Sequence, residues 1–407
     1  MTHAAEPKPG PLAGVRVLEL STVVLAPLAC QILGDLGADV IKVEPPSGDS
    51  NRQMGPARHP AMAAFYLTCN RNKRGVVLDV KQPAGLDALL RLAARTDVFV
   101  HNLRPRSLAT LGVDYESIRR VNPRVVYCGT YGYGRSGPYA DKAAYDDSIQ
   151  AASGIASLQA QLTGEPRYVP TLVADKTTAM NVVNCVLAAL LHRERTGEGQ
   201  EIEVPMFETM VAYVMVEHLF GHAFEPPEGP AGYKRILSHH RRPYATRDGF
   251  LAVLPYLDEH WRVFCTAAGR DDLVADPRFE TLRKRLDHID EVYAETGRII
   301  GTRTTAEWLQ ALADTDVPLM VVNSLDDLMT DEHLTAVGFW QTLEHPTEGR
   351  IRMPGVPATF SKTPGSIRRH PPRLGEHSVE VLREAGLTPD EIDALLEDGV
   401  TVQASTE

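Results

Sequence analysis

The chain has 407 residues, of which 43% are hydrophobic and 23% are charged, a composition typical of a soluble globular protein with more than one folding unit. Its formal net charge of −11 argues against a general nucleic-acid binder, because phosphate contacts require a basic surplus. The five cysteines are widely spaced and include no CxxC pair, so the sequence predicts neither a disulfide framework nor a cysteine zinc site.

At the start of the chain, MTHAAEPKPGPLAG lacks the apolar centre of a signal peptide. No later apolar run reaches the roughly 18 residues that span a bilayer. We therefore expect a cytoplasmic protein that is not inserted in a membrane.

The first third of the chain alternates strand and helix patterns. The expected strands are residues 15–20, 39–44, 75–80, 97–102 and 124–130, and the expected helices are residues 29–38 and 85–95. Strands that alternate with helices predict βαβ units and a parallel sheet. Because ligands of such folds bind beyond the carboxyl ends of the strands, we expect the site in the loops that follow these five strands.

The middle and the end of the chain have a different character. Residues 176–195 form one expected helix, apolar nearly all round and therefore predicted to be buried, and residues 206–222 form another. The Pro- and Gly-rich residues 225–232 indicate a linker. A hairpin at residues 244–255 and helices at 258–313 follow, and then a tail of short strands and turns that ends in a helix at 388–397.

The motif GYGRSG at residues 132–137 has the GxGxxG spacing of a dinucleotide-binding loop. Pro138 follows it at once, no helix pattern opens after it, and it comes after the fifth expected strand and not the first. We therefore favour a loop in which glycines allow a ligand or backbone to approach closely.

Other candidate sites have weaker support. His218 and His222 are spaced to share one helix face, but no third ligand is evident and HEXXH is absent, so no metal site is predicted. The basic stretch SHHRRP, with His239, His240, Arg241 and Arg242, is either a solvated loop or a contact for an anionic substrate. No GxSxG elbow or phosphate-binding GxxxxGK[ST] loop is present.

Asp175 stands in TLVADKTTAMN, where an apolar run meets the expected helix. Aspartate is a preferred N-cap, so the spacing favours a capping role. A carboxylate at a helix N-terminus is also expected to stay ionised, and a fixed, desolvated carboxylate can attack an activated acyl group. The spacing leaves both roles open.

The chain resembles the class III CoA transferases, the CaiB/BaiF family that includes formyl-CoA transferase, over nearly its whole length. The stretches that carry this resemblance are PLAGVRVLELSTVVLAP, LGDLGADVIKVEPPSGD, NRNKRGVVLDV, TDVFVHNLRP, NPRVVYCGTYGYGRSGPY, TGEGQEIEVPMFE, MPGVPATFSKTPG and PPRLGEHSVEVL. Their number and order make a chance resemblance implausible.

The resemblance implies an α/β fold and a domain plan. It implies a Rossmann-like large domain over residues 1–224, a smaller α+β domain over 225–330, and a segment over 331–407 that returns to the large domain. It also implies that two chains interlock as a homodimer. The expected substrates are an acyl-CoA and a carboxylic acid, with no tightly bound cofactor, metal or nucleic acid.

The resemblance also assigns residues to roles. Asp175 matches the nucleophile that carries an acyl anhydride and then a CoA thioester, and Asp146 matches an acidic residue of the catalytic cycle. The residues that match positions contacting CoA or covering the site are Val23, Leu78, Lys81, Asn102, Leu103, Tyr145 and Met206. Arg104 or Arg106 is expected to replace arginines that the formate and oxalate enzymes have where this chain has Pro45 and Thr110.

Val24 stands where the formate and oxalate enzymes have a catalytic-loop glutamine, so formate and oxalate are doubtful substrates.

Two alternatives to CoA transfer remain open at this point, a racemase and a CoA-binding protein without catalysis. The fold also hosts an α-methylacyl-CoA racemase, whose histidine would align with Tyr145; tyrosine, with a free pKa near 10, is a poor base at neutral pH, which favours transfer. A CoA-binding protein without catalysis is the second alternative.

Overall fold

The computed structural model describes residues 9–405 and divides them into two compact units. Unit 1 contains the described residues up to Gly154, then Tyr168–Tyr213, and the chain from His333 onward. Unit 2 contains Ile155–Arg167 and Val214–Glu332. The division into domains at residues 1–224, 225–330 and 331–407 stays a prediction about which parts fold independently.

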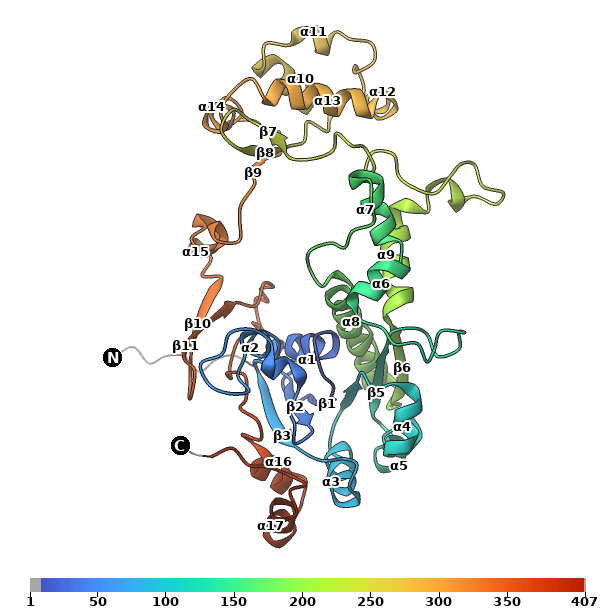
Figure 1. The fold of residues 1–407 in the computed structure, drawn as a ribbon, viewed down its shortest axis with the longest axis vertical. Coiled ribbons are helices and arrows are strands. Elements are labelled where there is room, and N and C mark those ends of the chain that lie inside the picture. The colour runs from blue at the N-terminus through green and yellow to red at the C-terminus, as the bar shows by residue number, and fades with distance from the viewer. Residues whose placement is uncertain (1–8, 406–407) are drawn as a thin grey trace. The chain divides into compact units, whose positions relative to one another are not determined.

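Unit 1 is built on a six-stranded parallel sheet, labelled in Figure 1. Its strands are β1 (Arg16–Leu20), β2 (Asp39–Glu44), β3 (Lys73–Val77), β4 (Val98–His101), β5 (Val126–Tyr131) and β6 (Gln200–Pro205). The strand order is β3-β2-β1-β4-β5-β6, the order of a doubly wound dinucleotide-binding fold. This confirms the α/β class and the parallel sheet.

Helices cover both faces of this sheet, because alternate residues of each strand point to opposite sides. On one face, Leu18 of β1, Phe99 of β4 and Tyr127 of β5 form a core with the helices α3, α4, α5, α16 and α17. On the other face α1 packs against α8. The bounds of the helices in unit 1 are α1 (Leu25–Asp35), α2 (Ala64–Cys69), α3 (Pro83–Ala93), α4 (Pro105–Leu111), α5 (Tyr115–Val121), α6 (Asp146–Ala152), α8 (Val173–Thr196), α16 (Ser378–Glu384) and α17 (Pro389–Glu397), with the short 3-10 helix η1 (Ser50–Gln53).

The C-terminal part of unit 1, red in Figure 1, returns to the first strands of the sheet. The N–H of Val77 in β3 donates to the hydroxyl of Ser378, and α16 packs against β3. A separate antiparallel pair, β10 (Trp340–His345) and β11 (Gly349–Pro354), precedes this return. The C-terminal segment therefore completes the packing of the sheet.

Unit 2 has its own core beneath a small antiparallel sheet. The sheet has the order β7 (Tyr244–Ala245), β8 (Phe250–Val253), β9 (Leu319–Val321), which confirms the expected hairpin. Trp261, Phe264 and Trp308 lie in its core. The helices of unit 2 are α7 (Ile155–Thr163), α10 (Asp258–Ala267), α11 (Asp271–Val274), α12 (Leu282–Asp287), α13 (Ile289–Ile300) and α14 (Thr305–Ala311), with the 3-10 helices η2 (Phe220–Ala223) and η3 (Asp327–Met329). Two further helices, α9 (Met206–His218) and α15 (Glu332–Ala336), each contribute residues to both units.

Three expectations about the elements need correction. The helix expected from residue 29 begins at Leu25, and strand β6 was not expected, because its glutamates alternate with apolar residues in a short edge strand. The helix α8 is not buried on all sides, since Met180 and Leu191 are 60% and 52% exposed in the single chain. None of the helices in residues 9–405 is long and apolar enough to cross a membrane.

Candidate active site

A pocket that opens to solvent lies in unit 1 beyond the carboxyl ends of three neighbouring strands. Its walls come from residues 22–25 after β1, residues 102–105 after β4, and residues 130–132 at the end of β5. The loop before α6 and the first residues of α8 and α9 complete it. Strand order reverses between β1 and β4, so the pocket occupies the switch point at which such sheets bind ligands.

Asp175 lines this pocket from the first turn of α8. It is the third residue of the helix, and the N-cap position belongs to Leu172, whose side chain accepts no capping bond. The expectation that Asp175 caps the helix is therefore wrong. Within residues 9–405 its carboxylate has no hydrogen-bond or ion-pair partner, although the residue is only 9% exposed. It is a desolvated carboxylate left free for a ligand.

Asp146 supplies the cap that α8 lacks. Its Oδ1 accepts the backbone N–H groups of Ala174 at 2.8 Å and Asp175 at 3.0 Å, and its Oδ2 accepts the side-chain amide of Gln150 at 2.6 Å. Both of its oxygens are thus engaged, and the side chain is buried. Asp146 does not line the pocket but fixes the backbone that carries Asp175.

The environment of Asp175 changes its acidity. Burial in the pocket wall, together with the negative charge of Asp146, raises the pKa of Asp175 from 3.8 to about 7. The expectation of a carboxylate held ionised by the helix N-terminus is therefore wrong, because Asp146 occupies the amides that would have stabilised the charge. Near neutral pH the ionised form is populated but poorly solvated, which favours attack on an electrophile.

The structure brings most of the expected site residues together around Asp175. The pocket is lined by Val23, Asn102, Leu103, Arg104, Tyr145 and Met206. Leu78 does not line it and is buried in the sheet core, and Lys81 lies exposed beyond β3. Of the two arginines expected to replace the missing ones, Arg104 lines the pocket and Arg106 does not.

The pocket carries positive charge at its rim. Arg104 is exposed at the start of α4, and Lys142 lies with its ammonium 3.6 Å from the centroid of the Tyr139 ring. Neither of these two cations forms an ion pair with any residue between 9 and 405. They are therefore available to an anionic ligand.

Comparison with known proteins decides the family. A family model described as CoA-transferase family III matches residues 12–378. The chain belongs to CoA-transferase family III. It is therefore a CoA-transferase, and CoA thioesters are its substrates.

Individual relatives of this CoA-transferase cover nearly the whole chain. A succinate–glutarate CoA-transferase of Agrobacterium fabrum is 36% identical over 94% of this chain and 98% of its own length. A succinyl-CoA:glutarate CoA-transferase of Mus musculus is 33% identical over 97% of this chain and 91% of its own length. A solved CaiB/BaiF family protein from Brucella suis superposes with a TM-score of 0.78 at 30% identity, covering 93% of this chain and all of that one.

The glycine-rich loop of the CoA-transferase is packed against carboxylates of its own chain. The N–H of Gly134 donates to Glu208, and the N–H of Arg135 donates to Glu203. A Cβ on Gly132 would lie 2.2 Å from the Cβ of Ala144, so the glycine is needed for close approach of the loop before α6. The close-approach interpretation is confirmed, and the amides of Gly134 and Arg135 are not free to hold a pyrophosphate.

The histidine pair does not form a metal site in the part of the CoA-transferase that the structure describes. Residues 9–405 contain no group of three histidine, cysteine or acidic side chains placed to hold a metal ion. His218 is buried, and its Nδ1 accepts the backbone N–H of Tyr233. His218 thus has a structural partner within unit 2.

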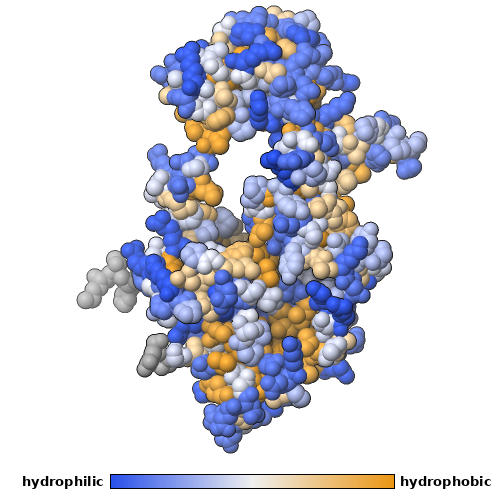
Figure 2. Space-filling view, viewed as in Figure 1, coloured by the Kyte–Doolittle hydropathy of each residue, from blue (hydrophilic) through white to orange (hydrophobic). Residues whose placement is uncertain are grey.

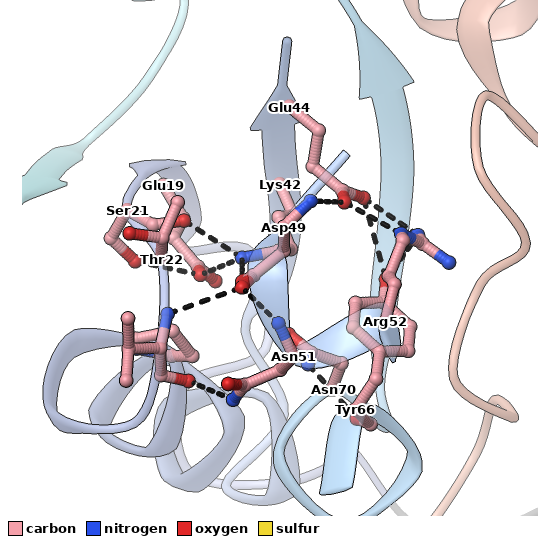
Figure 3. Close-up of polar contacts among 12 residues, drawn as sticks. Glu19, Ser21, Thr22, Lys42, Glu44, Asp49, Asn51, Arg52, Tyr66 and Asn70 are labelled. Atoms are coloured by element: carbon pink, nitrogen blue, oxygen red, sulfur yellow. Dashed lines mark hydrogen bonds and ion pairs between the residues drawn. The ribbon is translucent and has the colours of Figure 1, made fainter. Parts of the chain in front are cut away.

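Sequence reasoning missed a set of buried charges beside the pocket, drawn in Figure 3. Glu19, Lys42 and Lys73 are fully buried at the sheet strands, and Asp49 and Arg52 lie buried in the loop after β2. A signal was present, because the strand positions that alternate with the core residues Leu18, Ile41 and Val76 hold one charged residue in β1, two in β2 (Lys42 and Glu44) and one in β3.

Proposed function

We propose that the enzyme moves CoA from an acyl-CoA to a free carboxylic acid through covalent intermediates on Asp175. The observation that carries this proposal is a buried carboxylate that has no partner within residues 9–405, in a pocket at the sheet switch point. A hydrogen-bonded or ion-paired carboxylate would first have to break those interactions. Asp175 makes no such interaction with the described part of the chain, so it has none to break there.

The reaction proceeds by substitution at three carbonyl carbons, those of the donor acyl group, of Asp175 and of the acceptor acid. The Asp175 carboxylate attacks the thioester carbonyl, a C–O bond forms, the C–S bond breaks, and CoA leaves as a thiolate. The thiolate attacks the aspartyl carbonyl of the mixed anhydride, which releases the donor acid and leaves CoA on Asp175 as a thioester. The acceptor carboxylate then attacks this thioester, and the displaced thiolate attacks the acceptor carbonyl, which regenerates Asp175.

Backbone groups and cations of the pocket support this chemistry. The helix α1 begins at the pocket without a capping side chain and with no acidic residue in its first turn. Free N–H groups at a helix N-terminus stabilise negative charge, as on the oxygen of a tetrahedral intermediate. Arg104 and Lys142 are placed to attract the phosphates of CoA.

The experiment that tests the proposal is a transfer assay. Because two relatives are named for succinate and glutarate, succinyl-CoA with glutarate is the first pair to measure, followed by a panel of other acids. Wild-type enzyme is expected to form the acceptor CoA ester, and Asp175→Asn is expected to lose at least about a thousandfold in kcat. Full activity of Asp175→Asn would overturn the assignment.

A second experiment, the exchange of an α-proton with deuterated water, separates transfer from racemisation. Tyr145 is 68% exposed at the N-cap of α6, where the racemase of this fold would need a histidine. We therefore expect no exchange of the α-proton of a 2-methylacyl-CoA with deuterated water. Robust exchange without an acceptor acid would favour the racemase.

The acceptor acid is proposed to be an anion with a second charged group. In unit 2, Arg235, Arg241 and Arg242 line one cleft with Tyr293, and none of these arginines forms an ion pair with residues 9–405. Replacing Arg241 and Arg242 by alanine is expected to raise the KM of a dicarboxylate acceptor more than that of the acyl-CoA donor. An equal rise for a monocarboxylate acceptor would contradict a role in recognising the second charge.

The interlocked homodimer is also a proposal, supported by the resemblance and by uncovered apolar surface. Met180 and Leu191 of α8 and Val216 of α9 are more than half exposed in the single chain, and Figure 2 shows apolar residues (orange) reaching the surface in several places. Light scattering of the purified protein is expected to give twice the mass of one chain. A monomer that is fully active would contradict the proposal.

A further inference from the structure

The turn from β1 to α1, residues 21–24, contributes Thr22, Val23 and Val24 to one wall of the pocket, in a conformation that its sequence disfavours. Val23 has φ of +72°, and a β-branched residue with positive φ is a genuine outlier. Such strain persists only where the surroundings hold it, and it gathers at functional sites. Val23 and Val24 line the same pocket as Asp175.

Three polar side chains hold the backbone of this turn. The N–H of Val23 donates to Oδ1 of Asp49 at 3.2 Å, and the carbonyl of Val23 accepts the side-chain amide of Asn51. The side chain of Asn102 bonds both polar groups of Thr22, accepting its N–H at 3.2 Å and donating to its carbonyl at 2.8 Å. The backbone N–H and carbonyl groups of Thr22 and Val23 are thus all hydrogen-bonded to side chains from outside the turn.

Asp49 is itself fixed by a buried ion cluster, which consists of Glu19, Lys42, Asp49 and Lys73. Glu19, Lys42 and Asp49 are labelled in Figure 3. The ammonium of Lys42 lies 3.0 Å from Oδ2 of Asp49 and 3.0 Å from Oε1 of Glu19, and the ammonium of Lys73 lies 2.7 Å from Oε2 of Glu19. The cluster holds two positive and two negative charges. Although burial alone would raise the pKa of Asp49, the Lys42 ammonium and the N–H donors of Asn51 and Val23 bring it below its usual value, so Asp49 is ionised.

The cations of the cluster also bind the turn and the helix that follows it. Lys42 donates to the carbonyl of Ser21 at 2.9 Å, and Lys73 donates to the carbonyl of Pro27 in the first turn of α1 at 2.8 Å. Buried ion pairs are weak contributors to stability compared with apolar packing. Because Asp49, Lys42 and Lys73 all bond the backbone of residues 21–27, the cluster is better explained by the conformation that it imposes on this segment.

We propose that Asp49 is a positioning residue for CoA transfer, which holds Val23 in its left-handed conformation and so sets the pocket wall and the start of α1 relative to Asp175. The proposal rests on the proposed function. It assigns a role to a residue outside the pocket, since Asp49 does not line it.

Substitutions at Asp49 separate the hydrogen bond from the charge. Asp49→Ala removes the acceptor for Val23 and is expected to lower kcat at least tenfold, with the KM of the acyl-CoA changed less than threefold. Asp49→Asn loses the charge but keeps an acceptor oxygen, so it is expected to retain kcat within threefold while both variants melt at lower temperature than wild type. Equal kcat losses in the two variants would contradict the proposal that the hydrogen bond from Val23 to Asp49, here called the clamp, positions the turn.

A matched control removes a buried hydrogen bond on the other side of Asp49. Tyr66 is fully buried, and its hydroxyl accepts a 2.6 Å bond from Arg52, which in turn pairs with Glu44. Tyr66→Phe is expected to lower the melting temperature while leaving kcat within twofold of wild type. If Tyr66→Phe slows transfer as much as Asp49→Ala, the effect is one of general stability and the proposal fails.

The strain at Val23 supplies a second test. Glycine adopts positive φ without steric cost, so a turn with Val23→Gly depends less on the clamp. The fold-loss in kcat caused by Asp49→Ala is expected to be at least fivefold smaller in the Val23→Gly background than in the Val23 background. If the fold-loss in kcat of the double variant equals the product of the fold-losses of Asp49→Ala and Val23→Gly, Asp49 does not act through Val23.

Hydrogen exchange gives a readout that needs no substrate. In Asp49→Ala, the peptide covering residues 20–26 is expected to exchange at least tenfold faster, while peptides of α8 keep their wild-type rates and Tyr66→Phe shows no change in residues 20–26. Unchanged exchange in Asp49→Ala would overturn the clamp even if transfer occurs. Faster exchange in a protein that transfers no CoA would overturn the proposed function and leave the clamp standing.

Discussion

Replacing Asp175 by asparagine is expected to stabilise the protein at pH 8, because the wild-type carboxylate is ionised in a site that solvates it poorly. The pKa of Asp175 is raised from 3.8 to about 7 by burial and then by the charge of Asp146. Each pH unit between these values corresponds to ~1.4 kcal/mol, so the interval corresponds to about 4 kcal/mol. The residue is only 9% exposed, so solvent screens little of this free energy.

The direction of this pH effect on stability follows from the protonation of Asp175 in the folded and the unfolded chain. Below about pH 4 both the folded and the unfolded chain carry the proton on Asp175, and ionisation does not distinguish the variant from wild type. Between pH 4 and pH 7 the unfolded chain loses the proton first, so the folded wild type loses stability as the pH rises. Above pH 7 the loss is complete.

The assay is thermal melting of both proteins from pH 4.5 to pH 8.5. At roughly 2 °C per kcal/mol, the asparagine variant is expected to melt up to about 8 °C higher at pH 8, with the gap closing toward pH 4.5. Asp147→Asn, an exposed change one residue from Asp146, is the matched control and is expected to show no such trend. A variant that melts lower than wild type at pH 8, or a gap independent of pH, would refute the reasoning.

Three further predictions concern turnover. The kcat/KM of transfer is expected to fall as the pH drops through about 7, since protonated Asp175 is not a nucleophile; a profile flat from pH 8 to pH 5 would contradict this. Asp146→Asn removes the neighbouring charge and is expected to move this acid-side fall in kcat/KM to lower pH in the same assay. A fall at the same or a higher pH would contradict an effect of the Asp146 charge on the pKa of Asp175. Arg104→Ala with Lys142→Ala is expected to raise the KM of the acyl-CoA about tenfold with kcat within threefold and to weaken its salt dependence; an unchanged KM would show that these cations do not hold the phosphates.

The architecture and the place of the site could be predicted from the sequence because both depend on local patterns. Apolar strands that alternate with helices led to the parallel sheet, and the loops after residues 20, 102 and 130 indeed form pocket walls. The edge strand β6 was missed since its charged residues, Glu201 and Glu203, pair with Arg135 from a distant loop. That pairing has no local signature.

The electrostatics of the site could not be predicted because they depend on which groups meet in space. Spacing suggested that Asp175 capped its own helix and stayed ionised, whereas Asp146, 29 residues earlier, takes the helix amides and raises the pKa of Asp175. The turn at Thr22 and Val23 is likewise held from two other loops, with Asp49 bonded to Val23 and Asn102 bonded to Thr22. Such contacts become visible only when the strands are placed side by side.

The most direct test of the central claim is mass spectrometry of the protein after incubation with an acyl-CoA and no acceptor. The account predicts an adduct with the mass of CoA bound as a thioester, located on the peptide that contains Asp175 and absent from Asp175→Asn. Hydroxylamine should remove it and convert the carboxyl to a hydroxamate. Turnover by an enzyme that carries no adduct on Asp175, or an adduct that persists in Asp175→Asn, would contradict the account.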